Sequence, residues 1–325
     1  MIITRTPLRI SFAGGSTDLP SFYRANGGGA VTSAAIDRYV HVLVNDKFDR
    51  SVRVAYSRTE NVQRFEELQH GLVREAMRVT GATEALEVHT IADIPGEGTG
   101  IGSSSSLTVG LLQALYAYRG ILKDPAELAR EACEIEINRL GSVIGKQDQY
   151  IAALGGIQYL EFLPDDSVRN QPIPLSREDR ELLSKHMTLF YTGITRQAGR
   201  ILEGVVAREK ENLEAMRRIR ALALETRDAI LARDWRRIGA VLDEGWQLKR
   251  SLSAGVSTDA IDTAYARAKA AGAWGGKITG AGGGGFLFLF HDPEQSAQVA
   301  AAVSPMVRVP VRIVPEGSRI LFVGR

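Results

Sequence analysis

The sequence predicts a two-domain α+β protein. The chain has 325 residues, and at roughly 100–200 residues per domain it is long enough to bury two cores. The first part alternates short apolar and polar runs, as strands do, whereas the last third is dominated by long helical patterns. Residues 164–182 carry three prolines and no hydrophobic period. We therefore place one domain at residues 1–165 and the other at residues 166–325.

The composition excludes several classes of function. Forty Lys and Arg residues against 38 Asp and Glu residues leave a net charge of +2, so there is no broad positive field for nucleic acid. No apolar run reaches the roughly 20 residues of a membrane-spanning helix, and the N-terminus lacks the apolar core of a signal peptide. The single cysteine, Cys133, suits a reducing compartment. We expect a cytoplasmic protein without nucleic-acid or membrane partners.

The N-terminal half is expected to mix strands and helices. Asp124-Pro125-Ala126-Glu127 has the form of a capping box with proline at the first helical position, which predicts a helix start there. The expected elements are short strands up to about Tyr56, a helix from about Val62 to Gly81, a strand at 86–92, helices at 107–119 and 125–140, and a short helical stretch that starts at residues 145–150 and ends in Gly155-Gly156.

The C-terminal half is expected to be mainly helical, because its charged segments carry apolar residues at helical spacing. A second glycine-rich segment, residues 277–285, leads into an apolar run. The expected elements are a strand at 187–191, helices at 196–233, 235–251 and 258–271, one later helix, and a β-region at 306–323.

A glycine- and serine-rich segment, Gly98 to Ser106, lies between a predicted strand and an apolar helix. Small residues at a helix start direct several backbone N–H groups to one point, where the helix dipole favours an anion. The spacing matches neither the GxxxxGK[ST] pattern nor an intact GxGxxG dinucleotide fingerprint. The segment therefore indicates a phosphate-binding loop, with a flexible linker as the alternative.

Glu136 has an unusual position in its predicted helix. It lies on the apolar stripe with Ala129, Ala132, Cys133 and Leu140. A carboxylate turned toward a protein interior needs a counter-charge or a metal ion. A glutamate at the edge of the stripe that reaches solvent is the alternative.

Three further polar residues have ordinary explanations when each is taken singly. Asp18 and Asp148 occur where an aspartate commonly caps a helix. Arg9 alternates with Leu8 and Ile10, as a solvated strand residue does. Their significance comes from the order and spacing of the segments that contain them.

Three segments together resemble the motifs of the GHMP kinase superfamily, which includes galactokinase, homoserine kinase, mevalonate kinase and phosphomevalonate kinase. They are residues 7–18, 95–106 and 277–285, in the family's order and at similar spacing. Within the superfamily, residues 4–18 and 145–150 look most like the D-glycero-D-manno-heptose 7-phosphate kinases. The resemblance implies a mixed α/β N-terminal domain that binds ATP and a C-terminal domain of helices on an antiparallel sheet.

The resemblance also implies roles for individual residues. The second motif wraps the ATP phosphates in such kinases, and its matching residues here are Gly98, Gly100, Gly102, Ser103, Ser104 and Ser105. A serine of that motif and a helix glutamate hold Mg²⁺, which match Ser104 and Glu136. The proposed catalytic base matches Asp148, and the arginine that would pair with it matches Arg9. We therefore expect ATP and Mg²⁺ as cofactors.

The expected acceptor is a small sugar or sugar phosphate. Galactokinases carry a glutamate at the position of Gly15, which argues against galactose. Lys146 and Arg196 could receive a substrate phosphate by charge-assisted hydrogen bonds. The expected acceptor-binding residues are Gly15, Ser16, Thr17, Asp18, Lys146, Arg196, Gly282 and Gly283. The expected reaction phosphorylates the anomeric hydroxyl of a heptose 7-phosphate to give the 1,7-bisphosphate.

Other interpretations stay open. The same chemistry could serve fucose, another hexose or an isoprenoid alcohol. A non-catalytic relative that binds a ligand is a further alternative, although the joint presence of Arg9, Ser104, Glu136 and Asp148 argues against it. A dinucleotide-dependent oxidoreductase would need an intact GxGxxG followed by an acidic residue about 20 positions later, and the sequence has neither. The oligomeric state is left open, a homo-oligomer included.

Overall fold

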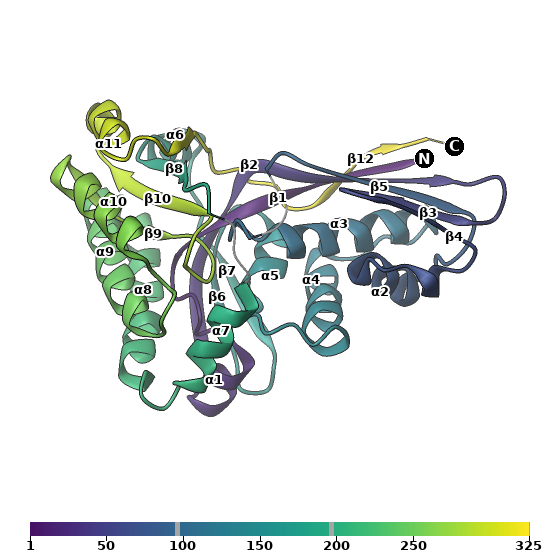
Figure 1. Cartoon of the computed structure of the whole chain (residues 1–325), viewed down its shortest axis with the longest axis horizontal. Helices are drawn as coiled ribbons and strands as arrows, with labels where there is room; N and C mark the ends of the chain where they lie inside the picture. The colour runs from purple at the N-terminus through teal and green to yellow at the C-terminus, as the bar shows by residue number, and fades with distance from the viewer. Residues whose placement is uncertain (95–97, 195–197, 325) are drawn as a thin grey trace.

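The computed structural model describes residues 1–94, 98–194 and 198–324, and these residues build two sheets with helices around them (Figure 1). The strands are β1 (Ile2–Ala13), β2 (Gly29–Asp46), β3 (Val52–Ala55), β4 (Thr59–Val62), β5 (Leu86–Ala92), β6 (Ile157–Phe162), β7 (Val168–Pro172), β8 (Met187–Tyr191), β9 (Ala273–Ile278), β10 (Phe286–His291), β11 (Val307–Val309) and β12 (Arg319–Val323). The eight-stranded sheet has the order β12-β1-β2-β5-β3-β4, with β6 paired to β2 and β7 to β6. The four-stranded sheet, β11-β8-β10-β9, is antiparallel.

Two long strands form the backbone of the larger sheet. Strands β1 and β2 are antiparallel and pair from Ile2 opposite Val44 to Ala13 opposite Thr32. Because β2 is 18 residues long, its first part pairs with β6 and its second part with β5. The strands predicted as short runs are therefore much longer than expected. The pair β3–β5 is parallel, which makes this sheet mixed.

Eleven α-helices are assigned within the described residues. They are α1 (Pro20–Ala25), α2 (Gly71–Thr80), α3 (Ser103–Tyr118), α4 (Pro125–Cys133), α5 (Gln147–Leu154), α6 (Arg177–Lys185), α7 (Ala198–Ala207), α8 (Leu213–Leu231), α9 (Trp235–Ser251), α10 (Asp259–Ala270) and α11 (Ser296–Ala302). Helices α2 to α5 lie along one side of the larger sheet, and α8 to α10 gather beside β9 and β10 (Figure 1). The predicted α+β fold class is confirmed.

Two predicted helix starts were wrong. Val62 belongs to strand β4 and Phe65 begins a 3₁₀ turn, η1 (Phe65–Glu67), so α2 starts only at Gly71. Helix α3 starts at Ser103 rather than at Leu107, because Gly102 takes a left-handed conformation at its N-cap. The serines therefore form the first turn of α3 and do not precede it.

The predicted helix at 196–233 is broken into α7 and α8. The break covers residues 208–212, five consecutive polar residues that offer no apolar side chain to the core. Asn212 is buried there, and its side-chain amide donates to the carbonyl of Leu252 over 2.6 Å. That contact fixes the turn against the end of α9.

The two sheets share a core, which places the elements of the two halves against each other. Residues of β1, among them Leu8, Ile10 and Phe12, form one buried cluster with Phe286 and Phe288 of β10. The rings of Phe12 and Phe288 meet edge to face, with centroids 5.8 Å apart. A rigid connection of this kind can hold groups from both halves at one site.

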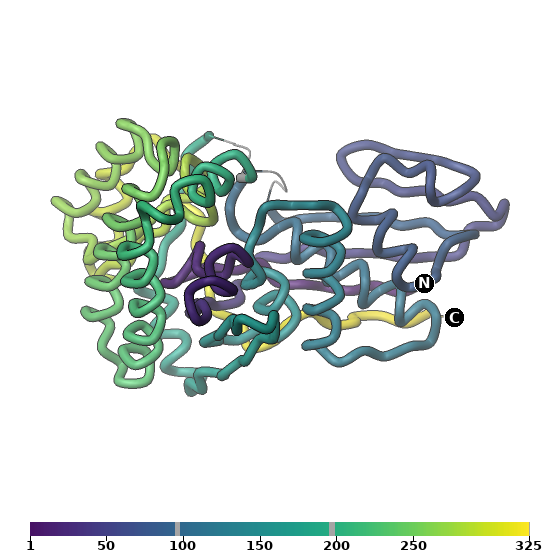
Figure 2. Tube along the Cα trace, turned by 90° about the horizontal axis from the view of Figure 1, so that it is seen from below, coloured from purple at the N-terminus to yellow at the C-terminus, as the bar shows by residue number. Residues whose placement is uncertain are grey.

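The expected domain boundary falls between β6 and β7. Both β7 and the C-terminal β12 nevertheless belong to the larger sheet, and the two chain ends lie side by side in Figure 2. The N-terminal ammonium group of Met1 donates to the carbonyl of Gly324 over 2.8 Å. The division into two domains stays a prediction, with β7 and β12 on the side of the N-terminal strands. None of the helices in the described residues is long and apolar enough to span a membrane.

Candidate active site

A pocket with a volume of about 230 Å³ opens where β1, α3, α5 and the loop after β9 meet. Each of these elements contributes polar groups, so the lining comes from both halves of the chain. The predicted site residues that line it are Arg9, Gly15, Ser16, Asp18, Gly98, Gly100, Gly102, Ser103, Ser104, Ser105, Glu136 and Asp148. Residues predicted from separate motifs are thus brought together.

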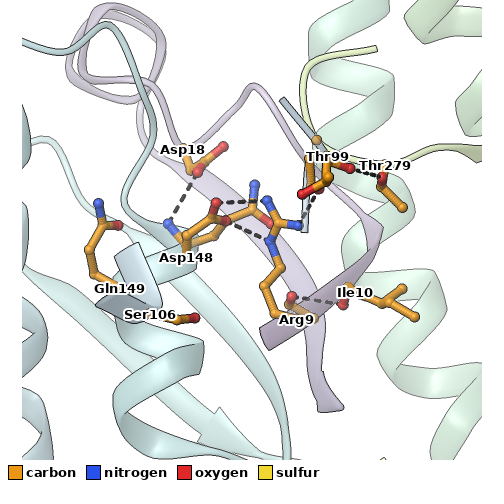
Figure 3. A network of polar contacts seen from close by, with 12 residues as sticks. Arg9, Ile10, Asp18, Thr99, Ser106, Asp148, Gln149 and Thr279 are labelled. Carbon is orange, nitrogen blue, oxygen red and sulfur yellow. Dashed lines mark hydrogen bonds and ion pairs between the residues drawn. The ribbon is translucent and has the colours of Figure 1, made fainter. Parts of the chain in front are cut away.

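Arg9 and Asp148, which both line this pocket, form a bidentate ion pair (Figure 3). Nε of Arg9 donates to Oδ1 of Asp148 over 2.6 Å, and Nη2 donates to Oδ2 over 2.7 Å. The third guanidinium nitrogen, Nη1, donates to the carbonyl of Gly100 over 2.7 Å. The Arg9 side chain is only 4% exposed, whereas that of Asp148 is 23% exposed. The pair therefore fixes the orientation of a carboxylate that still faces the pocket.

Ser104 and Glu136 form a second polar contact on the α3 side. Glu136 lies in η2 (Glu134–Arg139), a π-helical turn that continues α4, and its predicted inward position is confirmed by 1% exposure. Its carboxylate accepts from the hydroxyl of Ser104 over 2.6 Å and from the amide of Gln149 over 2.7 Å. Burial raises the pKa of Glu136 to about 7, although hydrogen bonds from Ser104, Ser105 and Gln149 oppose this shift.

Asp18 is held beside the ion pair by backbone N–H groups. Oδ1 accepts from the N–H of Ser16 and Oδ2 from that of Gln147, each over 3.1 Å. The residue is 2% exposed. Burial first, and the charge of Asp148 second, raise the pKa of Asp18. Two carboxylates of the site thus lie near each other, with Arg9 beside them.

The two glycine-rich segments touch each other across the pocket. A Cβ on Gly280 would lie 2.6 Å from Cα of Gly100, so neither position leaves room for a side chain. The hydroxyl of Thr279 donates to the carbonyl of Thr99 over 3.0 Å (Figure 3). The loop before α3 and the loop after β9 are therefore joined into one wall.

Several predicted acceptor-binding residues have other surroundings. The Thr17 hydroxyl donates to the carbonyls of Gly14 and Ala30 and so supports the turn. The ammonium of Lys146 donates to the carbonyl and carboxylate of Asp166 and lies over the Tyr23 ring. Gly282 and Gly283 follow the lining residues Gly280 and Ala281, but are not among the residues that line the pocket in the described chain. Arg196 lies outside the described residues.

Several polar residues of the lining were not predicted from the sequence, among them Ser11, Gln147, Lys249 and Lys277. Ser11 and Gln147 are 6% and 8% exposed, and the Ser11 hydroxyl and the Gln147 carbonyl have no hydrogen-bond partner within the described residues. Lys277 and Lys249 are also buried. The burial of Lys249 could have been predicted from the sequence, because Lys249 continues the apolar stripe of Leu242 and Trp246 on α9. Glu136 was predicted to lie inward by the same reasoning.

Comparison with known proteins agrees with this arrangement. The model of the GHMP kinases N terminal domain matches residues 67–156, and that of the GHMP kinases C terminal region matches residues 226–306. The D-glycero-alpha-D-manno-heptose 7-phosphate kinase of Campylobacter jejuni is 32% identical over 320 residues, which cover 93% of each protein. The chain belongs to the GHMP kinase family. This kinase is thus a phosphotransferase that uses ATP and an alcohol group as the acceptor, and the family prediction from the three motifs is confirmed.

Two further relatives show the breadth of the family around this kinase. A solved D-glycero-D-manno-heptose 1-phosphate kinase from Bacteroides thetaiotaomicron superimposes with a TM-score of 0.84 at 26% identity, over the full length of both chains. The L-fucokinase/L-fucose-1-P guanylyltransferase of Bacteroides fragilis is 28% identical over 91% of this kinase, which corresponds to only 35% of that longer protein.

Proposed function

We propose that this kinase is a sugar kinase that transfers the γ-phosphoryl group of ATP to the anomeric hydroxyl of a heptose 7-phosphate, giving the 1,7-bisphosphate. The observation that supports a heptose 7-phosphate as the acceptor is the similarity to the Campylobacter jejuni heptose 7-phosphate kinase over 93% of both proteins. The polar lining agrees with a polyhydroxylated acceptor, because buried groups such as the Ser11 hydroxyl require hydrogen-bond partners.

Asp148 is the proposed base for the acceptor hydroxyl. Arg9 donates one hydrogen bond to each carboxylate oxygen of Asp148. Each oxygen therefore keeps a second lone pair that can accept a proton. The acceptor proton would move to Asp148 while the hydroxyl oxygen forms a bond to the γ-phosphorus atom, and the bond from that atom to the bridging oxygen would break and release ADP. Asp18 would hold neighbouring sugar hydroxyls, since its carboxylate lines the same pocket. Arg9 acts here as a positioning residue for Asp148.

The first turn of α3 is the proposed binding site of the ATP phosphates. Helix α3 is 16 residues long and begins inside the pocket wall, so its unpaired N–H groups and its dipole favour an anion there. The close packing of Gly100 against Gly280 brings backbone, and no side chain, toward this position. Phosphoryl transfer depends mainly on positioning and charge neutralisation, which such a wall supplies.

The residues at the α3 start fit a magnesium ion. Mg²⁺ prefers oxygen ligands and usually takes one or two from protein and the rest from phosphates and water. The hydroxyl of Ser104 and the carboxylate of Glu136 are such ligands, and they lie 2.6 Å apart. When bound, the ion would neutralise phosphate charge during transfer. No cluster of three His, Cys, Asp or Glu residues occurs in the described chain, so a site made of protein ligands alone is not indicated.

The proposed function is tested by measuring ADP release from the purified full chain with ATP, Mg²⁺ and a panel of acceptors. The panel contains D-glycero-D-manno-heptose 7-phosphate, the corresponding 1-phosphate, the free heptose, L-fucose, galactose and mevalonate. We expect the highest kcat/KM with the 7-phosphate. Higher kcat/KM with the heptose 1-phosphate or with fucose would contradict the proposed acceptor, and both compounds are chosen because relatives carry these names.

A further inference from the structure

Two buried lysines, Lys249 and Lys277, share one wall of the pocket. Lys277 lies on β9 with 6% exposure, and Lys249 lies on α9 with 8% exposure. Both side chains line the pocket. The ammonium of Lys277 donates to the carbonyl of Phe12 over 3.1 Å, and that of Lys249 donates to the carbonyl of Gly280. We call these two residues the lysine pair.

The positive charges around Lys277 favour an anion in the pocket beside it. Burial lowers the pKa of Lys277 well below its usual value, and the charges of Lys249 and Arg9 lower it further, whereas Asp18 acts in the opposite direction. The charge of Arg9 is already matched by Asp148. A dianion beside both ammonium groups would relieve their repulsion and replace part of their lost hydration.

Lys277 lies toward the proposed acceptor end of the pocket, because its ammonium donates to the carbonyl of Phe12, next to the lining residue Ser11. Lys249 lies at the loop after β9, where Gly280 packs against Gly100. The charged groups that act on Lys277 are Lys249, Arg9 and Asp18, and Asp18 is the proposed sugar-binding carboxylate. The groups that act on Glu136, in contrast, are Ser104, Ser105, Gln149 and Asp148, which lie at the proposed ATP and metal side.

We propose that Lys249 and Lys277 form a phosphate-monoester subsite, which binds the phosphate that the acceptor already carries. This inference rests on the proposed function, because it assigns the position of the 7-phosphate within that acceptor. It also replaces the expectation for Lys146, whose ammonium is held by Asp166. The lysine pair then determines the choice between phosphorylated and free sugars, while Asp148 and Arg9 serve the hydroxyl at the other end.

The subsite is tested by the ratio of kcat/KM for the heptose 7-phosphate to kcat/KM for the free heptose. The ratio is measured for the full chain and for Lys249→Gln, Lys277→Gln and Lys146→Gln, together with KM for ATP and the thermal midpoint. Lys269→Gln is the matched control, because Lys269 also donates to a backbone carbonyl, that of Trp274 on β9, but pairs with Asp243 and does not line the pocket.

We expect the ratio to fall at least about tenfold in each variant of the lysine pair, since a lost hydrogen bond to a charged group has roughly that effect. Lys269→Gln should keep the ratio of the unmodified chain. Lys249→Arg should keep part of the ratio, because it preserves the charge. If Lys277→Gln lowers the thermal midpoint by more than about 5 °C, Lys249→Gln carries the test alone.

The outcomes separate the two proposals. An unchanged ratio in both variants of the lysine pair, or a fall in Lys146→Gln alone, would overturn the subsite while leaving the proposed acceptor in place. A rise in KM for ATP with equal losses for both sugars would assign the lysine pair to the ATP phosphates and would also overturn the subsite. An unmodified chain that does not prefer the 7-phosphate over the free heptose would overturn the proposed acceptor, and the subsite with it.

Discussion

Arg9 and Asp148 lie 139 residues apart in the chain, yet their side chains meet through two hydrogen bonds in the lining of the pocket. A buried guanidinium without its partner is costly, because an unpaired charge remains in a medium of low dielectric constant. The test of Asp148 must therefore keep the shape of the side chain and remove only its charge and basicity. Asparagine meets this condition and can still accept one hydrogen bond from Arg9.

We predict that Asp148→Asn lowers kcat by about 10²- to 10⁴-fold, which is the range for loss of a positioned general base. The Kd for ATP should barely change, because Asp148 does not belong to the α3 start. Steady-state kinetics with the heptose 7-phosphate and a nucleotide titration measure the two effects. A loss in kcat of less than about tenfold would favour late proton release without a base, with Asp148 only orienting the sugar.

Gly102 allows a second test at the scale of one residue. Its φ is +79°, and a Cβ would lie 3.1 Å from Cγ of Arg9 and 3.5 Å from the carboxylate of Asp148. We predict that Gly102→Ala lowers the free energy of unfolding by about 1–2 kcal/mol, because alanine disfavours this conformation, and also lowers kcat by displacing Arg9. Denaturant unfolding and steady-state kinetics measure the two effects.

Gly120 at the other end of α3 provides the matched control. Its φ is +75°, and a Cβ there would meet nothing within 4 Å. Gly120→Ala should lower stability by a similar amount and leave kcat unchanged. Equal kcat in the two variants would show that the space beside Arg9 is not critical for catalysis.

At the scale of elements, the sequence correctly predicted features that depend on interactions between residues close together in the chain. The capping box at Asp124 is present, with both of its hydrogen bonds, and α4 starts where it was expected. The break between α7 and α8 depends on a contact of Asn212 with the distant Leu252, which no local pattern reveals. In the site, Glu136 was predicted from its stripe, whereas the pocket position of Lys277 follows from strand pairing of β9 with β10.

The contact between the two glycine-rich loops gives a prediction at this scale. Thr279→Val keeps the shape of the side chain but removes its hydrogen bond to the Thr99 carbonyl, which is buried. We expect the free energy of unfolding to fall by about 1 kcal/mol, and KM for ATP to rise, because the loop before α3 loses its support. Thr226→Val is the control, since Thr226 makes a similar bond to the Leu222 carbonyl within α8. An unchanged KM for ATP in Thr279→Val would contradict the proposed coupling of the loops.

At the scale of the whole molecule, α1 is tied to the turn after β6 through Asp166. The carboxylate accepts from the Tyr23 hydroxyl over 2.6 Å and from the Arg24 guanidinium over 2.9 Å. Burial acts to raise the pKa of Asp166, but hydrogen bonds from Arg24 and Tyr23 outweigh it and lower that pKa to about 2. A folded-state pKa below the unfolded value of 3.8 means that ionised Asp166 stabilises the fold.

We predict that Asp166→Asn lowers the free energy of unfolding by about 0.5–1 kcal/mol at neutral pH, a value reduced for the 45% exposure of the carboxylate. The difference from the unmodified chain should stay constant at higher pH and decrease as the pH falls from about 4 to about 2. Urea unfolding across this pH range measures it. A difference that grows on acidification would contradict the assigned role of Asp166.

The central claim concerns the molecule as a phosphotransferase whose pocket sets the position of the new phosphate. The most direct measurement is ³¹P NMR of the product formed from ATP and D-glycero-D-manno-heptose 7-phosphate by the full chain, with ADP counted in the same sample. The account predicts one new phosphorus signal coupled to the anomeric proton and one ADP for each product molecule. A new phosphate on any other hydroxyl, or ADP formation without a second sugar phosphate, would contradict it.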